Sequence, residues 1–346
     1  MKKSILLGLN LLLATSVSAV AQAGAFFGAG ATFPKPVYLA WGKAYKAKSG
    51  DVLIYTAVGS GKGLAEILAA KTDFGASDMP FTTEELEKNG LIQFPAVIGG
   101  VVPTINIKGV GDGQLQLDGT TLAGIFLGKI SRWNDAKLAA LNPGLSLPND
   151  AIVVVHRADK SGATFNLSHY LSAVSAEWRT SQGEGFTLAW KAGVDAAGSE
   201  AMAQKIASTN GAIGYLDFAD IRKHHLAAVK LKNLDGQYVS PGVTSFAAAA
   251  AATQWKAANG FSEMLSNAPG KESWPITSAS FILLERTPRV TENVEAALKF
   301  FDWAYREGDV SAIDLGYVPL PDSVADLVRF AWKSQIKSRA GKPLWN

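Results

Sequence analysis

The sequence contains no cysteine among its 346 residues. This absence excludes disulfide bonds, thiolate nucleophiles and thiol-metal sites, and it excludes the lipidated cysteine that would tether an exported protein to a membrane. A strong charge of one sign is also lacking, because the formal net charge is only +3 and includes Lys2 and Lys3. The composition therefore gives no argument for nucleic acid as a partner.

Histidine is scarce, and the motifs of common cofactors are incomplete. There are four histidines, and the one adjacent pair, His224-His225, would point in different directions on a helix, so we expect no metal. The ATPase phosphate loop fails because Lys62 is followed by Gly63 in place of serine or threonine. Neither glycine-rich turn, 28–30 or 59–63, completes the dinucleotide fingerprint. We therefore expect no cofactor.

The N-terminus has the layout of a cleavable secretory signal. Lys2 and Lys3 precede an apolar run to about Val20, and small residues follow to Ala23. The run contains Asn10, Thr15 and Ser16 and is too short to span a bilayer. We expect residues 1–23 to be removed and the exported protein to diffuse freely.

The remaining chain predicts an α/β protein of two domains. About 320 residues exceed the usual size of one compact core. Strand-like runs precede helix-like runs at 52–58 and 63–70, at 152–156 and 164–174, and at 211–215 and 218–224. This alternation favours largely parallel sheets.

One turn, Arg157 to Thr164, combines a cation, a carboxylate and small residues between an expected strand and an expected helix. The amides of Ser161, Gly162 and Ala163 would lie at the helix start, where free amides and the helix dipole favour an anion. An ordinary helix cap beside a surface ion pair is the alternative. This turn is the first candidate oxyanion site.

Three further turns have similar chemistry. Gly28 to Pro34 places Thr32 before a helix-like stretch, Val58 to Gly63 places Ser60 after a strand, and Asp73 to Asp78 ends on a carboxylate. Hydroxyls and amides at such turns can point at one ligand. Four anion-binding turns in one chain are stronger evidence than any one of them.

The segments 28–34, 73–78, 93–102 and 157–162 together resemble the periplasmic phosphate-binding proteins of high-affinity phosphate ABC transporters. The resemblance continues through 211–215, 274–278, 298–305 and 320–324, and so spans nearly the whole mature chain. It implies the two-lobed periplasmic binding protein fold of type II, the Venus-flytrap fold, with a hinge of crossing strands. It also implies a periplasmic, monomeric protein that is not lipid-anchored.

The resemblance implies discontinuous domains. After the signal peptide, residues 24–97 and 278–346 should form lobe I, and residues 98–277 should form lobe II. Gly99-Gly100 and Ser278 to Ser280 are the hinge candidates, because the chain passes between lobes there. The alternative for the glycines is a plain strand with a bulge.

The resemblance also assigns a phosphate site. Thr32, Ser60 and Ser161 should donate hydroxyl hydrogens, Phe33 and Gly162 should donate amides, and Arg157 should supply the cation. Asp159 should orient Arg157. The implied ligand contacts are Thr32, Phe33, Ser60, Asp78, Arg157, Asp159, Ser161, Gly162 and Ala163.

Asp78 is the implied selectivity residue. A carboxylate beside a bound dianion is repelled unless the ligand brings a proton for it to accept, as phosphate does near neutral pH and sulfate does not. Arsenate shares the shape and protonation of phosphate and should compete. The implied protein partners are the inner-membrane phosphate ABC permease and its ATPase.

The sequence departs from the family pattern at four positions. Ala163 stands in place of the usual threonine, Gly61 replaces a serine, and Lys62 and Lys160 replace small residues. Because Ala163 lacks a hydroxyl donor, we expect weaker phosphate binding than the pattern gives.

Two alternatives stay open. A secreted phosphohydrolase could use Ser60 or Ser161 as nucleophile, but no histidine lies in these turns to act as base. An additional adhesion or signalling role at the cell surface is the second alternative. We predict a binding protein that is not an enzyme.

Overall fold

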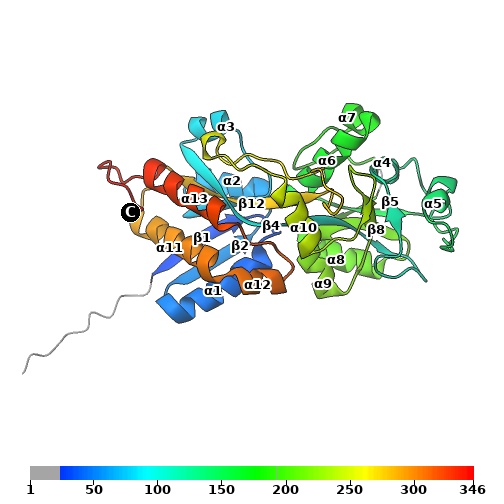
Figure 1. The fold of residues 1–346 in the computed structure, drawn as a ribbon, viewed down its shortest axis with the longest axis horizontal. Coiled ribbons are helices and arrows are strands. Elements are labelled where there is room, and N and C mark those ends of the chain that lie inside the picture. The colour runs from blue at the N-terminus through cyan, green and yellow to red at the C-terminus, as the bar shows by residue number, and fades with distance from the viewer. Residues whose placement is uncertain (1–23, 192) are drawn as a thin grey trace, which may run out of the picture.

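The computed structural model describes residues 24–191 and 193–346. The predicted signal peptide, residues 1–23, lies outside the described residues. The chain forms two α/β halves that lie side by side along the long axis of the molecule (Figure 1). No helix within the described ranges is long and apolar enough to cross a membrane.

The first lobe contains both the early and the late part of the chain. Its sheet has the order β2-β1-β3-β12, in which β1 pairs in parallel with β2 and β3, and β12 pairs antiparallel with β3. The elements are β1 (Ala25–Gly30), α1 (Lys35–Ser49), β2 (Val52–Ala57), α2 (Ser60–Leu68), β3 (Phe74–Ser77), α3 (Thr83–Lys88), β12 (Thr277–Glu285), α11 (Thr291–Glu307), α12 (Asp309–Asp314) and α13 (Asp322–Gln335).

The second lobe contains the middle of the chain. In its sheet β6 pairs in parallel with β8 and β7, and a small separate sheet has the order β11-β10-β5. The elements are β5 (Gln116–Leu117), α4 (Gly119–Phe126), α5 (Ala136–Leu141), β6 (Val153–Arg157), α6 (Gly162–Val174), α7 (Ala176–Ser181), β7 (Val194–Ala196), α8 (Gly198–Ser208), β8 (Ala212–Asp217), α9 (Phe218–His224), β9 (Ala227–Ala228), β10 (Lys230–Lys232), β11 (Tyr238–Val239) and α10 (Val243–Ala251).

One strand, β4 (Leu91–Asn106), belongs to the sheets of both lobes. Its residues 91–100 pair with β12, and its residues 101–106 pair with β8. The predicted α/β class and two-lobed fold are confirmed, and the parallel pairs lie within each lobe. The strands that join the lobes are antiparallel. The domain boundaries at 97/98 and 277/278 stay a prediction.

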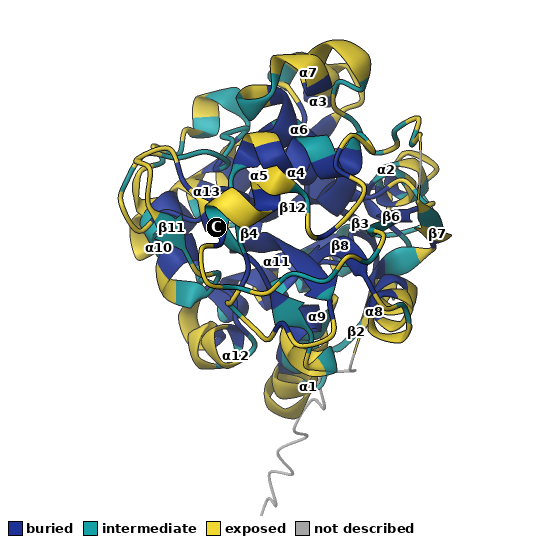
Figure 2. Ribbon diagram, turned by 90° about the vertical axis from the view of Figure 1, so that its right-hand side faces the viewer, coloured by how far each residue is buried: buried dark blue, intermediate teal, exposed yellow. Residues whose placement is uncertain are grey.

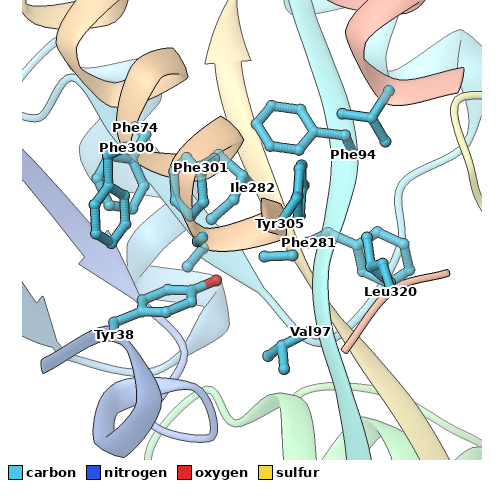
Figure 3. Close-up of a cluster of buried hydrophobic side chains, with 14 of the residues drawn as sticks. Tyr38, Phe74, Phe94, Val97, Phe281, Ile282, Phe300, Phe301, Tyr305 and Leu320 are labelled. Atoms are coloured by element: carbon cyan, nitrogen blue, oxygen red, sulfur yellow. The ribbon is translucent and has the colours of Figure 1, made fainter. Parts of the chain in front are cut away.

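Each lobe has its own hydrophobic core. The first-lobe core is rich in aromatic rings from α1, β3 and α11, and Figure 3 shows Tyr38, Phe74, Phe300 and Phe301 gathered in it. A second cluster fills the other lobe. Figure 2 shows the central strands buried and the outward faces of the helices exposed. Burial of apolar surface on both sides of the strands therefore holds the turns at the strand ends in place.

The paired glycines of β4 are required by close packing. A Cβ atom at Gly99 would lie 2.7 Å from Phe33 Cζ, and one at Gly100 would lie 2.2 Å from Phe246 Cε1. Both glycines pair regularly with β12, and the register shift of that pair lies between Ser280 and Phe281. The glycines therefore make room for one ring from each lobe, and the bulge lies elsewhere. Their role as a hinge stays a prediction.

Candidate functional site

The cation of the site lies at the end of β6. Arg157 is buried and forms a two-pronged ion pair with Asp159, Nε to Oδ1 at 2.7 Å and Nη2 to Oδ2 at 2.6 Å. Burial alone would lower the pKa of Arg157, but the hydrogen bonds and charge of Asp159 raise it. Burial would likewise raise the pKa of Asp159, and Arg157 lowers it. Asp159 therefore holds the planar guanidinium in one orientation.

The third guanidinium nitrogen of Arg157, Nη1, contacts both lobes. Nη1 donates to Thr32 Oγ1 at 3.3 Å and to Ser199 Oγ at 3.2 Å. The hydroxyls of Thr32 and Ser199 are themselves 2.9 Å apart. Thr32 follows β1 and Ser199 lies in the first turn of α8, so the guanidinium edge joins the two lobes.

A buried carboxylate lies in the first-lobe part of the site. Asp78 follows β3 and is 3 % exposed. Its backbone amide donates to Ser60 Oγ at 3.1 Å, and Ser60 Oγ donates to Asp78 Oδ2 at 3.4 Å. Burial raises the pKa of Asp78 to about 7, although the Ser280 hydroxyl, the Arg157 charge and the Ser60 hydroxyl oppose the rise. Asp78 can therefore gain or lose a proton near neutral pH.

The N-terminus of α6 lies against this carboxylate. Ser161 caps the helix, with its Oγ accepting from the Thr164 amide at 3.3 Å. The amides of Gly162 and Ala163 are the first of the helix, where no internal carbonyl can accept from them. A Cβ atom at Gly162 would lie 2.4 Å from Ser60 Oγ and 2.6 Å from Asp78 Oδ2. The missing side chain of Gly162 therefore lets the positive end of α6 meet the first lobe.

Phe33 has its ring in the core and its backbone at the site. The ring packs edge-on against Tyr317, with centroids 5.5 Å apart, and the Tyr317 hydroxyl donates to the Phe33 carbonyl at 2.6 Å. These contacts hold the backbone of residues 32–33 beside Arg157. The structure thus gathers all nine predicted ligand contacts at the ends of β1, β3 and β6 and the starts of α2 and α6.

Two of the residues that depart from the family pattern, Gly61 and Lys160, are in contact with each other. The Gly61 amide donates to the Lys160 carbonyl across the lobes at 3.2 Å. A Cβ atom at Gly61 would lie 2.7 Å from Lys160 Cβ. The missing side chain at 61 therefore makes room for the lysine at 160. The side chains of Lys62 and Lys160 are exposed at the edge of the site.

The sequence reasoning missed Ser199, Asp217 and Tyr215. Ser199 Oγ donates to Asp217 Oδ2 at 3.4 Å. Asp217 is buried, and its pKa is raised well above its ordinary value by burial and by the charges of Asp220 and Asp78. The Tyr215 hydroxyl accepts from the Arg157 amide at 3.1 Å. The turn before Ser199 has the same strand-turn-helix form as the four turns above, but its strand, β7, is only three residues long and leaves little signal in the sequence.

The histidine pair has no part in this site. His224 Nε2 lies 3.3 Å from Glu200 Oε2 at the surface, and the His225 backbone ends α9. Among residues 24–191 and 193–346, no group of three or more histidine, cysteine or acidic side chains has the arrangement of a metal site.

Comparison with known proteins identifies the superfamily and the fold of this chain. The family model for the PBP superfamily domain matches residues 16–307, so the chain belongs to this superfamily of two-lobed binding proteins. A solved phosphate-binding protein, PfluDING, in complex with phosphate shares the fold, with a TM-score of 0.74 at 21% identity over 92% of this chain and 96% of that one.

More particularly, the chain belongs to the family of PstS phosphate-binding proteins. It is 44% identical to the phosphate-binding protein PstS of Pasteurella multocida over 99% of both chains. It is also 44% identical to that of Haemophilus influenzae, over 92% of this chain and 95% of the relative. The resemblance inferred from the sequence turns is confirmed.

Proposed function

We propose that this protein captures inorganic phosphate between its two lobes and delivers it to an inner-membrane phosphate ABC permease and its ATPase. One observation carries the proposal. A buried cation, a buried carboxylate and the free amides of a helix start converge on one place, and both lobes contribute to it. Such a set fits a small tetrahedral anion that still has a proton.

The roles follow from the donors present. Arg157, held by Asp159, supplies the full positive charge. Thr32, Ser60 and Ser161 donate hydroxyl hydrogens, and Phe33, Gly162 and Ala163 donate amides. Each charge-assisted hydrogen bond contributes about 1.5–3 kcal/mol before the costs of ordering and desolvation, so a few of them suffice for tight binding.

Asp78 selects the ligand by its proton. With a pKa of about 7, the carboxylate and phosphate can share one proton near neutral pH. Fully ionised sulfate leaves ionised Asp78 facing a lone pair and a like charge in a buried place. Arsenate has the protonation of phosphate and competes for the site.

The cellular setting follows from the family. Membership of the PstS family supports a periplasmic binding protein that is exported with residues 1–23 as its signal. The proposal includes a monomeric protein. It also includes the lack of a lipid anchor, because the sequence has no cysteine to carry one.

The test is calorimetric titration of ligand-stripped protein with phosphate and then sulfate at pH 8, on the natural sequence and on Asp78→Asn. We expect tight phosphate binding, much weaker sulfate binding, and stronger sulfate binding by Asp78→Asn, because an amide can donate to an unprotonated oxygen. Asp195→Asn, an exposed carboxylate of the second lobe, is the matched control and should leave both titrations unchanged. Absence of phosphate binding by the natural sequence would reject the proposal.

The proposal includes no catalysis. A site that donates to every oxygen of a tetrahedral anion holds a hydrolysis product as firmly as a transition state. Turnover of a chromogenic phosphate ester that disappears in Ser60→Ala or Ser161→Ala would favour a phosphohydrolase instead.

A further inference from the structure

The strand beside Asp78, β12, lies opposite a bulge in β4. In the antiparallel pair of β3 and β12, Ser77 lies opposite Phe281, so the next residue of the chain, Asp78, is level with Ser280. In the pair of β12 and β4, Ser280 lies opposite Val97 and Phe281 lies opposite Pro95, so Ala96 of β4 is the extra residue of a bulge beside Ser280. A bulge of this kind bends a strand and redirects a side chain, and bulges are frequent next to functional sites. The fold therefore brings Ser280 to the carboxylate of the site.

Three buried polar atoms in this region have no hydrogen-bond partner among the described residues. They are Asp78 Oδ1, Ser280 Oγ and the hydroxyl oxygen of Tyr38. Ser280 and Tyr38 are fully buried. Burial raises the pKa of Asp78 and that of Tyr38, and in both cases the Ser280 hydroxyl opposes the rise. Because buried polar atoms are almost always paired, three such atoms on adjacent elements point to one shared network.

We propose that Ser280 is a specificity-determining positioning residue of the phosphate site: its hydroxyl donates to Asp78 Oδ1 and accepts a hydrogen bond from the Tyr38 hydroxyl. An ionised carboxylate can only accept hydrogen bonds. Tyr38 must therefore donate to Ser280, and Ser280 must donate to Asp78. This inference rests on the phosphate-binding function proposed above. Ser280 acts by keeping Asp78 ionised, and hence able to accept a proton from the ligand and to reject sulfate.

Other charges also act on Asp78. Arg157 on β6 favours its ionised form, whereas Asp217 at the end of β8 opposes it. Three buried phenols face the same region and have raised pKa values, so they stay neutral across the range in which Asp78 titrates; they are Tyr38, Tyr55 and Tyr317. Ser280 supplies a directed donor that none of these charged groups replaces, because it bonds the oxygen left unpaired by Ser60.

The test measures sulfate affinity by calorimetry from pH 5 to 9. In the natural sequence sulfate should bind below about pH 7 and lose affinity above it, as Asp78 ionises. In Ser280→Ala the protonated form of Asp78 should persist to higher pH. We expect the midpoint of this pH dependence to rise by about one pH unit. At pH 8 about half of Asp78 would then be protonated, so that sulfate binds roughly fivefold more tightly than in the natural sequence.

Three variants serve as controls. Ser278→Ala removes a neighbouring hydroxyl that contacts the backbone carbonyl of Asp78 at 3.5 Å, and it should not move the midpoint. Ser280→Thr keeps a hydroxyl and should restore the midpoint. Tyr38→Phe removes the hydroxyl that is proposed to donate to Ser280, and it should raise the midpoint by a smaller amount than Ser280→Ala.

The outcomes separate this inference from the proposed function. A natural sequence that binds no phosphate contradicts the function itself. A Ser280→Ala protein that binds phosphate but keeps the natural midpoint overturns the role of Ser280, as does an equal shift in Ser278→Ala. If Ser280→Ala fails to fold, Tyr38→Phe decides the question. An unchanged midpoint in Tyr38→Phe rejects the proposed hydrogen bonds from Tyr38 through Ser280 to Asp78.

Discussion

The two lobes bring different chemistry to the same place. The second lobe supplies Arg157, its partner Asp159 and the amide end of α6, which together favour negative charge. The first lobe supplies two hydroxyls and a buried carboxylate, Asp78, which on its own disfavours an anion. In the proposed function, one side of the site therefore attracts the anion, and the other side selects anions that carry a proton.

This difference teaches that affinity and selectivity can be changed separately. Removing charge from the second lobe should weaken the binding of every anion, whereas removing charge from the first lobe should change which anions bind. The three changes below are ordered by the size of their expected effect.

Arg157→Ala should have the largest effect. It removes the cation that contacts Thr32, and it leaves the partly buried Asp159 and the buried Asp78 without compensation. Removing one partner of a buried, hydrogen-bonded charge pair between protein and ligand costs about 2–5 kcal/mol of binding free energy, so phosphate affinity should fall by up to roughly a thousandfold. Calorimetry measures the loss. Arg132→Ala, an exposed arginine of the same lobe, is the control, and a loss below tenfold at Arg157 would show that the amides alone hold the ligand.

Asp78→Asn should stabilise the ligand-free protein at high pH. The pKa of Asp78 is raised on folding, from 3.8 to about 7, so its ionisation opposes folding increasingly as pH rises from about 4 to 7 and fully above 7. At 1.36 kcal/mol per pH unit, the gain in unfolding free energy at pH 8 is on the order of 4 kcal/mol.

Urea unfolding at pH 8 and at pH 4 checks this expectation, because the gain should disappear at the lower pH. Asp195→Asn, with its exposed carboxyl, should show no such pH dependence. An equal gain at both pH values would mean that the introduced amide improves packing, and that the charge of Asp78 has no cost.

Ala163→Thr should have the smallest effect and should increase affinity. Ala163 is buried in the first turn of α6, where a threonine hydroxyl would add one donor to the side of the site that attracts anions. One hydrogen bond contributes about 1 kcal/mol, so the gain should stay near fivefold. Ala173→Thr, on the exposed face of the same helix, controls for helix propensity. Unchanged or weaker phosphate binding would reject the idea that Ala163 lowers affinity.

Local patterns in the sequence were enough to predict the turns of the site. Strand-to-helix turns with hydroxyls, a cation or a carboxylate mark Thr32, Ser60, Asp78 and Arg157, because each depends only on residues close in sequence. Ser199 was missed because the strand before it, β7, is three residues long and gives almost no periodic signal.

Contacts between distant segments could not be predicted in this way. Ser280 lies about two hundred residues from Asp78 in sequence, and only the insertion of β12 beside β3 brings them together. The space needed by Phe33 and Phe246 beside Gly99 and Gly100 likewise depends on side chains from both lobes. A single sequence shows a glycine pair but not the rings that require it.

The position of β12 in the sheet also determines when the fold can be completed during synthesis. β12 lies between β3 and β4, yet it begins at Thr277, after the entire second lobe has been made. Until that strand arrives, β3 and the first ten residues of β4 lack the neighbour that joins them, so the central sheet stays open. The last part of the polypeptide is therefore what allows the chain to commit to its native topology, and a nascent chain that still lacks β12 has its central pairing unfinished.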